Sequence, residues 1–89
     1  MEDREFKIYR EDGSLVLEYH CFVGWGEEIL RRLIAEGLSP ASNQYGSNPH
    51  GWSSFKLLYD TTEGEEDALR EQLEGVLVRA DLKQESAGQ

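Results

Sequence analysis

The segment 5–23 reads EFKIYREDGSLVLEYHCFV and decides the fold class. Apolar and polar residues alternate on both sides of Asp12-Gly13, a dipeptide that favours a tight turn because it tolerates a positive φ. The pattern predicts a β-hairpin whose second strand runs from about Leu15 to Val23. Because side chains alternate between the two faces of a strand, the expected core face carries Leu15, Leu17, Tyr19, Cys21 and Val23.

Two helices and at least one more strand are predicted after this hairpin. The first helix spans about Glu27–Glu36, where apolar residues recur at helical spacing and Gly37 can end the helix. The second helix opens near Thr62. Its expected buried stripe is Leu69, Leu73, Val76, Leu77 and Ala80. A strand is expected over Ser53–Tyr59, and Ser42–Tyr45 is a further candidate strand.

Together these elements predict an α+β two-layer sandwich, in which a largely antiparallel sheet of three or four strands carries both helices on one face. The order is ββαβα, or ββαββα if Ser42–Tyr45 pairs. The second order would make the chain a duplicated ββα unit, and Gly26-Glu27-Glu28 and Gly64-Glu65-Glu66 open the two helices alike. Chance similarity of two acidic helix starts explains the same pattern. We expect one domain over residues 1–82 and a frayed polar tail over 83–89.

Charge and cysteine content narrow the classes of function. The 89 residues include 9 basic and 18 acidic ones, for a net charge of −9. Phosphate backbones need a basic footprint, so direct binding to nucleic acid or to an anionic membrane is not expected, whereas a basic protein surface fits this charge. No apolar run approaches the roughly 18 residues that span a bilayer, and the acidic N-terminus predicts no secretory signal. The single cysteine, Cys21, favours a cytoplasmic location.

No motif in the sequence indicates a metal, a cofactor or a catalytic centre. His20, Cys21 and His50 have no recognised ligand spacing. A nucleophile elbow and a Gly-rich phosphate loop with a lysine are both missing from the sequence. We therefore expect no cofactor and no metal, and we name no catalytic residue. Acid–base chemistry by paired carboxylates stays open because 18 acids are available.

The strongest candidate site is a stretch that avoids charge. From Gly37 to Tyr59 the only charged residue is Lys56, in a chain that is 30% charged. Aromatic residues beside Asn, Ser and Gly are typical of binding loops, so the candidate partner-binding residues are Tyr45, Asn48, His50 and Trp52. Tyr45 and Trp52 are expected to be partly exposed. The alternative is a hairpin with its turn at 46–51, in which Tyr45 and Trp52 pack across the two strands.

The second candidate surface is the acidic face of the last helix. It comprises Asp67, Glu71, Glu74 and Asp81, which recur near helical spacing opposite the buried stripe. Such a face can steer a basic partner toward the binding site. The alternative is a helix face that is only solvated, which has the same composition. A third candidate surface is the face of the sheet that the helices leave open. It carries Val16, His20 and Phe22, and this apolar surface suggests a homodimer through the open sheet face.

The favoured function is that of a small acidic, non-catalytic protein-binding module, of inhibitor, regulator or adaptor type. It would bind a protein partner through the uncharged aromatic loop and the acidic helix. One alternative is a dimeric small-molecule-binding regulatory domain, and another is a small enzyme that depends on carboxylates.

Overall fold

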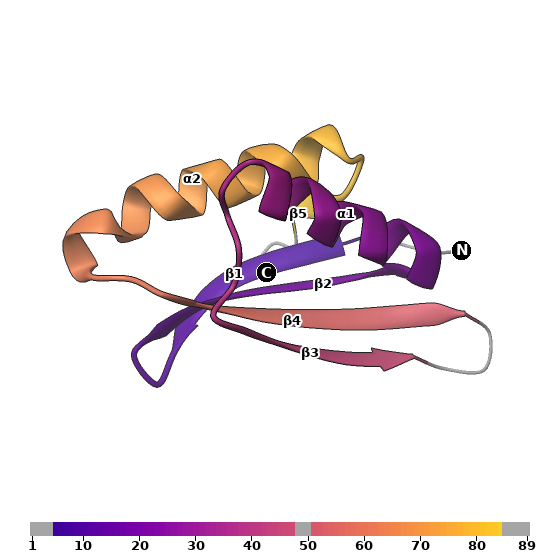
Figure 1. Cartoon of the computed structure of the whole chain (residues 1–89), viewed down its shortest axis with the longest axis horizontal. Helices are drawn as coiled ribbons and strands as arrows, with labels where there is room; N and C mark the ends of the chain where they lie inside the picture. Colours follow the sequence, from indigo (N-terminus) through magenta and orange to yellow (C-terminus); the bar gives the residue numbers. More distant parts are fainter. Residues whose placement is uncertain (1–4, 48–50, 85–89) are drawn as a thin grey trace.

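A computed structural model of the chain describes residues 5–47 and 51–84. The elements in chain order are β1 (Glu5–Glu11), β2 (Ser14–Phe22), α1 (Val23–Ala35), β3 (Ser42–Ser47), β4 (Trp52–Asp60), α2 (Glu63–Arg79) and β5 (Lys83–Gln84). The strands form one sheet in the order β3-β4-β2-β1-β5. All neighbours are antiparallel except β1 and β5. Both helices cover the same face of the sheet, which confirms the two-layer α+β prediction (Figure 1).

The charge-poor segment forms a second β-hairpin. Ser42, the first residue of the candidate strand, does begin β3, and β3 runs on to Ser47 and pairs with β4. The order of the main elements is therefore ββαββα, with β2 and β4 side by side at the centre of the sheet. This is the arrangement that a duplicated ββα unit requires. The short strand β5 adds Lys83 and Gln84, two residues that we assigned to the polar tail, to the edge of β1.

The first helix starts earlier than predicted. It begins at Val23 rather than near Glu27, and Val23 therefore opens a helix instead of ending the second strand. Two glycines in this first turn make a helix intrinsically unfavourable. Tertiary contacts overcome that preference: the indole Nε1 of Trp25 donates to the carbonyl of Ala80 at 3.1 Å, and Gly26 lies directly against the ring of Phe55.

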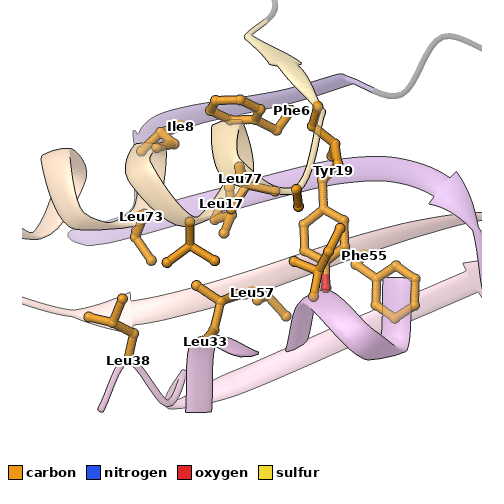
Figure 2. Close-up of a cluster of buried hydrophobic side chains, with 14 of the residues drawn as sticks. Phe6, Ile8, Leu17, Tyr19, Leu33, Leu38, Phe55, Leu57, Leu73 and Leu77 are labelled. Atoms are coloured by element: carbon orange, nitrogen blue, oxygen red, sulfur yellow. The ribbon is translucent and has the colours of Figure 1, made fainter. Parts of the chain in front are cut away.

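The core lies between the sheet and the helices (Figure 2). Within it Tyr19 stacks on Phe55, with ring centroids 5.0 Å apart and planes 6° from parallel. Both buried tyrosine hydroxyls have an acceptor, since Tyr19 donates to the carbonyl of Gly26 and Tyr59 to that of Leu38. Burial raises the pKa of both phenols above its ordinary value. The expected core face of the second strand is confirmed by the burial of Leu15, Leu17, Tyr19 and Cys21, and Phe55, Leu57 and Tyr59 of β4 are buried on the same face.

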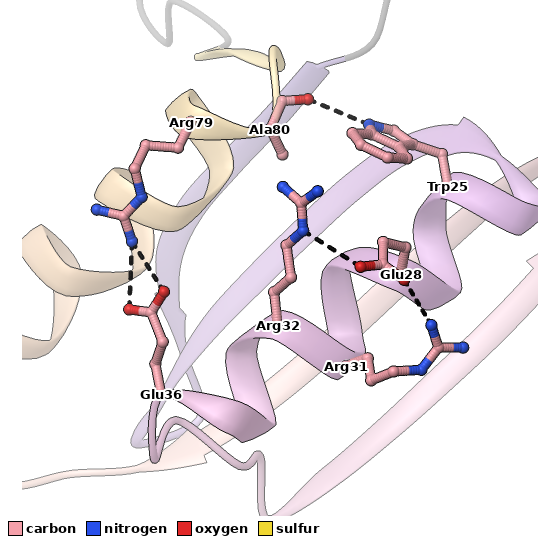
Figure 3. Close-up of polar contacts among 7 residues, drawn as sticks. All are labelled: Trp25, Glu28, Arg31, Arg32, Glu36, Arg79 and Ala80. Atoms are coloured by element: carbon pink, nitrogen blue, oxygen red, sulfur yellow. Dashed lines mark hydrogen bonds and ion pairs between the residues drawn. The ribbon is translucent and has the colours of Figure 1, made fainter.

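The two helices are joined to each other by polar contacts at their facing sides (Figure 3). Arg79 of α2 pairs with Glu36 at 2.9 Å, just beyond the last residue of α1. The guanidinium of Arg32 lies over the ring of Trp25, 5.0 Å from its centroid. These contacts identify the side of α1 that carries Trp25, Arg32 and Glu36 as the side that faces α2.

Candidate functional site

β3 is an edge strand, and its exposed residues form the candidate site. Residues 42–46 are all exposed, and none of these five residues is charged. Tyr45 lies opposite Phe55, and the two rings are tilted by 59° with centroids 5.0 Å apart. Its side chain nevertheless keeps 52% of its surface exposed, as expected from the sequence. Tyr45 thus packs on one side against Phe55 of the core and leaves about half of its surface in solvent.

Of the other predicted residues of the aromatic loop, the structure describes only the backbone of Trp52. Trp52 is the first residue of β4 and lies opposite Phe22 of β2. Asn48 and His50 lie outside the described residues, and so does the side chain of Trp52. The backbone arrangement is the hairpin that we considered as the alternative to a long loop. Its cross-strand aromatic pair, however, is Tyr45 with Phe55 rather than Tyr45 with Trp52.

Three of the four acidic residues lie together on α2. Asp67 and Glu71 are exposed and Glu74 is half-buried. The fourth, Asp81, lies beyond the end of the helix, with a left-handed backbone at φ 68°. The N–H of Asp81 donates to the carbonyl of Val78, and the next N–H returns to that of Leu77. These are the contacts of a helix C-terminal cap, so the acidic stripe comprises Asp67, Glu71 and Glu74.

The structure does not bring the two candidate surfaces together. α2 is tied to β1, because Arg70 of α2 donates to the carbonyl of Ile8 at 2.9 Å and Glu66 pairs with Arg10. β1 is separated from β3 by both central strands. The acidic stripe and the exposed β3 edge therefore lie toward opposite edges of the sheet, and only a large partner could touch both.

The open face of the sheet is held together by polar pairs. Glu18 accepts a hydrogen bond from the Tyr9 hydroxyl at 2.9 Å, and Lys56 pairs with Glu11 at 3.1 Å. Burial, the hydrogen bond to Glu18 and nearby carboxylates raise the pKa of Tyr9 to about 12. Val16, although it lies on this face, is fully covered. The face is consequently more polar than Val16, His20 and Phe22 alone suggest, although Phe22 itself stays 48% exposed.

A shallow depression of about 250 Å³ lies beside β3, on the open side of the sheet. It is lined by Glu18, Gln44, Tyr45, Gly46, Ser54 and Lys56. The hollow exists because Gly46 and Ser54, which lie opposite one another, leave little side chain above the sheet. Glu18, one of the lining residues, already accepts the Tyr9 hydroxyl.

Residues 5–47 and 51–84 offer neither a metal site nor a membrane-spanning helix. In these ranges, no cluster of three or more His, Cys, Asp or Glu side chains could hold a metal ion. No helix in the same ranges is long and apolar enough to cross a membrane.

Glu66 is a residue whose role the sequence did not reveal. Its carboxylate bridges Arg70 of the same helix, at 3.0 Å, and Arg10 of β1. Hydrogen bonds from Arg70 and then from Arg10 lower the pKa of Glu66. The Glu66–Arg70 spacing of four residues is a recognisable helical ion pair, but the contact with Arg10 depends on the tertiary structure.

This lowered pKa predicts an acid-dependent contribution of Glu66 to stability. The contribution is fully present above the ordinary carboxyl pKa of about 4.3 and is lost as the pH falls through the folded-state pKa. Glu66→Gln should lower the melting temperature at about pH 7, and the difference from the unmodified chain should vanish near pH 2. Thermal unfolding across this range measures it, with exposed Glu71→Gln as the control. A deficit of equal size at both pH values would contradict the assignment.

Comparison of the chain with family models, with curated proteins and with solved structures found no match. The fold and the site define its class: a two-layer α+β domain of ββαββα order, in which no strand within 5–47 and 51–84 pairs with the outer side of β3.

Proposed function

We propose that the chain is a small acidic, non-catalytic protein-binding module, of inhibitor, regulator or adaptor type, which contacts its partner through the β3 edge. The observation that carries this proposal is the combination of exposure and neutrality along β3: residues 42–46 are exposed, uncharged and centred on an aromatic side chain. In a chain of net charge −9, such a surface is the easiest one to desolvate.

The chemistry of β3 matches the way proteins recognise extended segments. An edge strand presents unpaired N–H and C=O groups that can accept another strand, and main-chain hydrogen bonds then supply affinity while side-chain pockets supply specificity. Interface cores are depleted in charge and enriched in aromatic residues such as Tyr45. The predicted contributions of Asn48, His50 and Trp52 would extend the same surface beyond the end of β3.

The two alternatives have less support. A small-molecule site usually is a cleft or cavity of about 300–1,000 Å³ that buries most of its ligand, whereas the depression beside β3 is shallow and has about 250 Å³. A carboxylate enzyme needs a carboxyl group with a raised pKa in a cleft. The shift at Glu66 has the opposite direction, and the group is held by two arginines. We therefore favour protein binding.

The test of this proposal is Tyr45→Ala. Loss of the ring contact with Phe55 should cost about 0.5–1.5 kcal/mol of stability, which leaves the chain folded. Binding of a protein partner isolated from the source cells should weaken about 30-fold, which corresponds to about 2 kcal/mol for an interface anchor. Titration calorimetry and thermal unfolding measure the two effects separately.

The matched control for Tyr45→Ala is Val78→Ala. Val78 is 57% exposed on α2, so its truncation removes a comparably exposed apolar side chain from another surface. It should leave partner binding unchanged. If Tyr45→Ala binds the partner as tightly as the unmodified chain does, β3 is not the contact surface and the proposal is wrong.

The acidic stripe of α2 would act in this function by steering. If the partner is basic, its association rate should fall as salt rises, because exposed charges are screened beyond about 8 Å at physiological ionic strength. Replacement of Asp67 and Glu71 by Asn and Gln should flatten this dependence in stopped-flow measurements without changing the dissociation rate. An association rate that does not respond to salt would exclude the stripe from the mechanism.

A further inference from the structure

The two edges of the sheet differ in how far other segments cover their backbone groups. At one edge, β5 pairs with Glu5 and Phe6 of β1, and Arg70 donates to the next outward position at the carbonyl of Ile8. At the other edge, no segment of the described ranges pairs with the outer side of β3. Proteins commonly guard such an edge with Lys, Pro or a covering element. Residues 42–47 include neither Lys nor Pro.

The flank of the molecule beside β3 is partly apolar, and its one charged residue on the helical stripe of Leu30 and Ile34 is the exposed Glu27. α1 lies over β2 and β4, where Gly26 touches Phe55 of β4, and its α2-facing side carries Trp25 and Arg32. At 100° per residue, Leu30 and Ile34 lie on the opposite flank of α1, toward β3. Ile34 is 51% exposed, and Tyr45 on the same side of the sheet is 52% exposed. Aliphatic and aromatic surface is thus left open along the edge whose backbone groups have no partner strand within 5–47 and 51–84.

We propose that β3 pairs antiparallel with β3 of a second copy of this chain. A twofold axis perpendicular to the sheet would give one continuous sheet with all four main helices on one face. In an antiparallel pair, residues opposite each other have their side chains on the same face of the sheet. If the twofold axis passes through Tyr45, this condition is met, and the two Tyr45 side chains lie opposite each other. This inference rests on the proposed function, since it names a partner for the same β3 surface.

Charge favours a second copy at this edge over other contacts between copies. α2, with its acidic stripe, lies over β1 at the far side of the sheet. In the proposed dimer the two β1 strands are seven strand spacings apart, or about 34 Å. This distance is roughly four Debye lengths at physiological ionic strength. The net charge of −9 on each copy therefore opposes association least when the neutral β3 edges meet.

The helix layers of the two copies leave room for the side chains at the junction. Because α1 packs over both β2 and β4, the two α1 helices would be about four strand spacings, roughly 19 Å, apart. This exceeds the 8–10 Å of directly packed helices. The gap lies above the two β3 strands, and Tyr45 and Ile34 of both copies border it. Their burial supplies the apolar area that the six-residue strand pairing alone lacks.

Sedimentation equilibrium of the full chain tests the proposal over protein concentrations from about 1 μM to 1 mM. We expect a reversible monomer–dimer equilibrium. Tyr45→Lys and Gln44→Lys should each raise the dissociation constant at least about tenfold, because both place like charges near the axis. Gln44→Lys keeps the Tyr45–Phe55 contact, so it still tests the interface if Tyr45→Lys fails to fold. Gln72→Lys, the same substitution at an exposed position of α2, should leave the dimer unchanged.

Two results would overturn the inference: a chain that stays monomeric throughout this range, or a dimer that both lysine substitutions at β3 leave intact. The second result would indicate another interface, such as the open face of the sheet. If the chain is monomeric and Tyr45→Lys still abolishes capture of a host protein, the dimer is excluded and the proposed function stands. If Tyr45→Lys changes neither dimerisation nor capture, both are excluded.

Discussion

Gly26→Ala is expected to lower the free energy of unfolding by about 3 kcal/mol, near the upper end of the cost of overpacking a core. A Cβ atom at this position would lie 2.1 Å from Cε1 of Phe55. The Phe55 ring cannot easily retreat, because it is stacked on Tyr19 and contacts Tyr45, with both centroid distances at 5.0 Å. The carbonyl of Gly26 also accepts the buried Tyr19 hydroxyl, so a displaced helix would weaken that bond too.

The control for this substitution is Gly24→Ala in the same helical turn. A Cβ at Gly24 meets nothing within 4 Å, and alanine is favoured over glycine in a helix by about 0.5–1 kcal/mol. Gly24→Ala should therefore be neutral or stabilising. Urea unfolding of both variants measures the difference. If Gly26→Ala were as stable as Gly24→Ala, the close approach of α1 to Phe55 would be wrong.

Leu57→Ala is expected to destabilise the fold by about 2–5 kcal/mol, as large-to-small changes in a closed core do. Leu57 is completely buried at the centre of the sheet, opposite Leu17 of β2. The helices cover this face, so the cavity cannot be filled by water. For a domain of this size, the change should lower the melting temperature by more than about 10 °C.

The next residue of the same strand supplies the comparison. Leu58 lies on the open face and is only half-buried, so Leu58→Ala should cost about 1 kcal/mol. The contrast between two neighbouring leucines tests whether the helices cover only one face of the sheet. Equal losses in thermal unfolding would mean that the open face is covered as fully as the core.

Much of the fold follows from local patterns in the chain. Alternation around Asp12-Gly13 is enough to predict the first hairpin and its core face, because a one-residue change of register would move every apolar side chain to solvent. The apolar stripe of α2, which ends at Ala80, likewise predicts its buried side. Both are confirmed by the burial of Leu15, Leu17, Leu73 and Leu77.

The start of α1 could not be predicted in the same way. Val23 continues the alternation of the strand, and two glycines follow within the next three residues, so local preference argues against a helix there. The helix begins at Val23 because Gly26 fits against Phe55 and Trp25 reaches the carbonyl of Ala80. Phe55 and Ala80 are far from α1 in the sequence, and no local pattern reports such contacts.

The candidate site, too, was predicted in part from the sequence and depends in part on the tertiary structure. The amino-acid sequence by itself determined that residues 37–59 avoid charge and that Tyr45 stands within them, because composition is a local property. Only the tertiary structure decided that β3 is the open edge of the sheet, while β5 and Arg70 close the other edge. It also decided that the acidic stripe lies far from that edge. Edge and centre are set by the order of strands, which depends on pairing between distant segments rather than on the residues of any one strand.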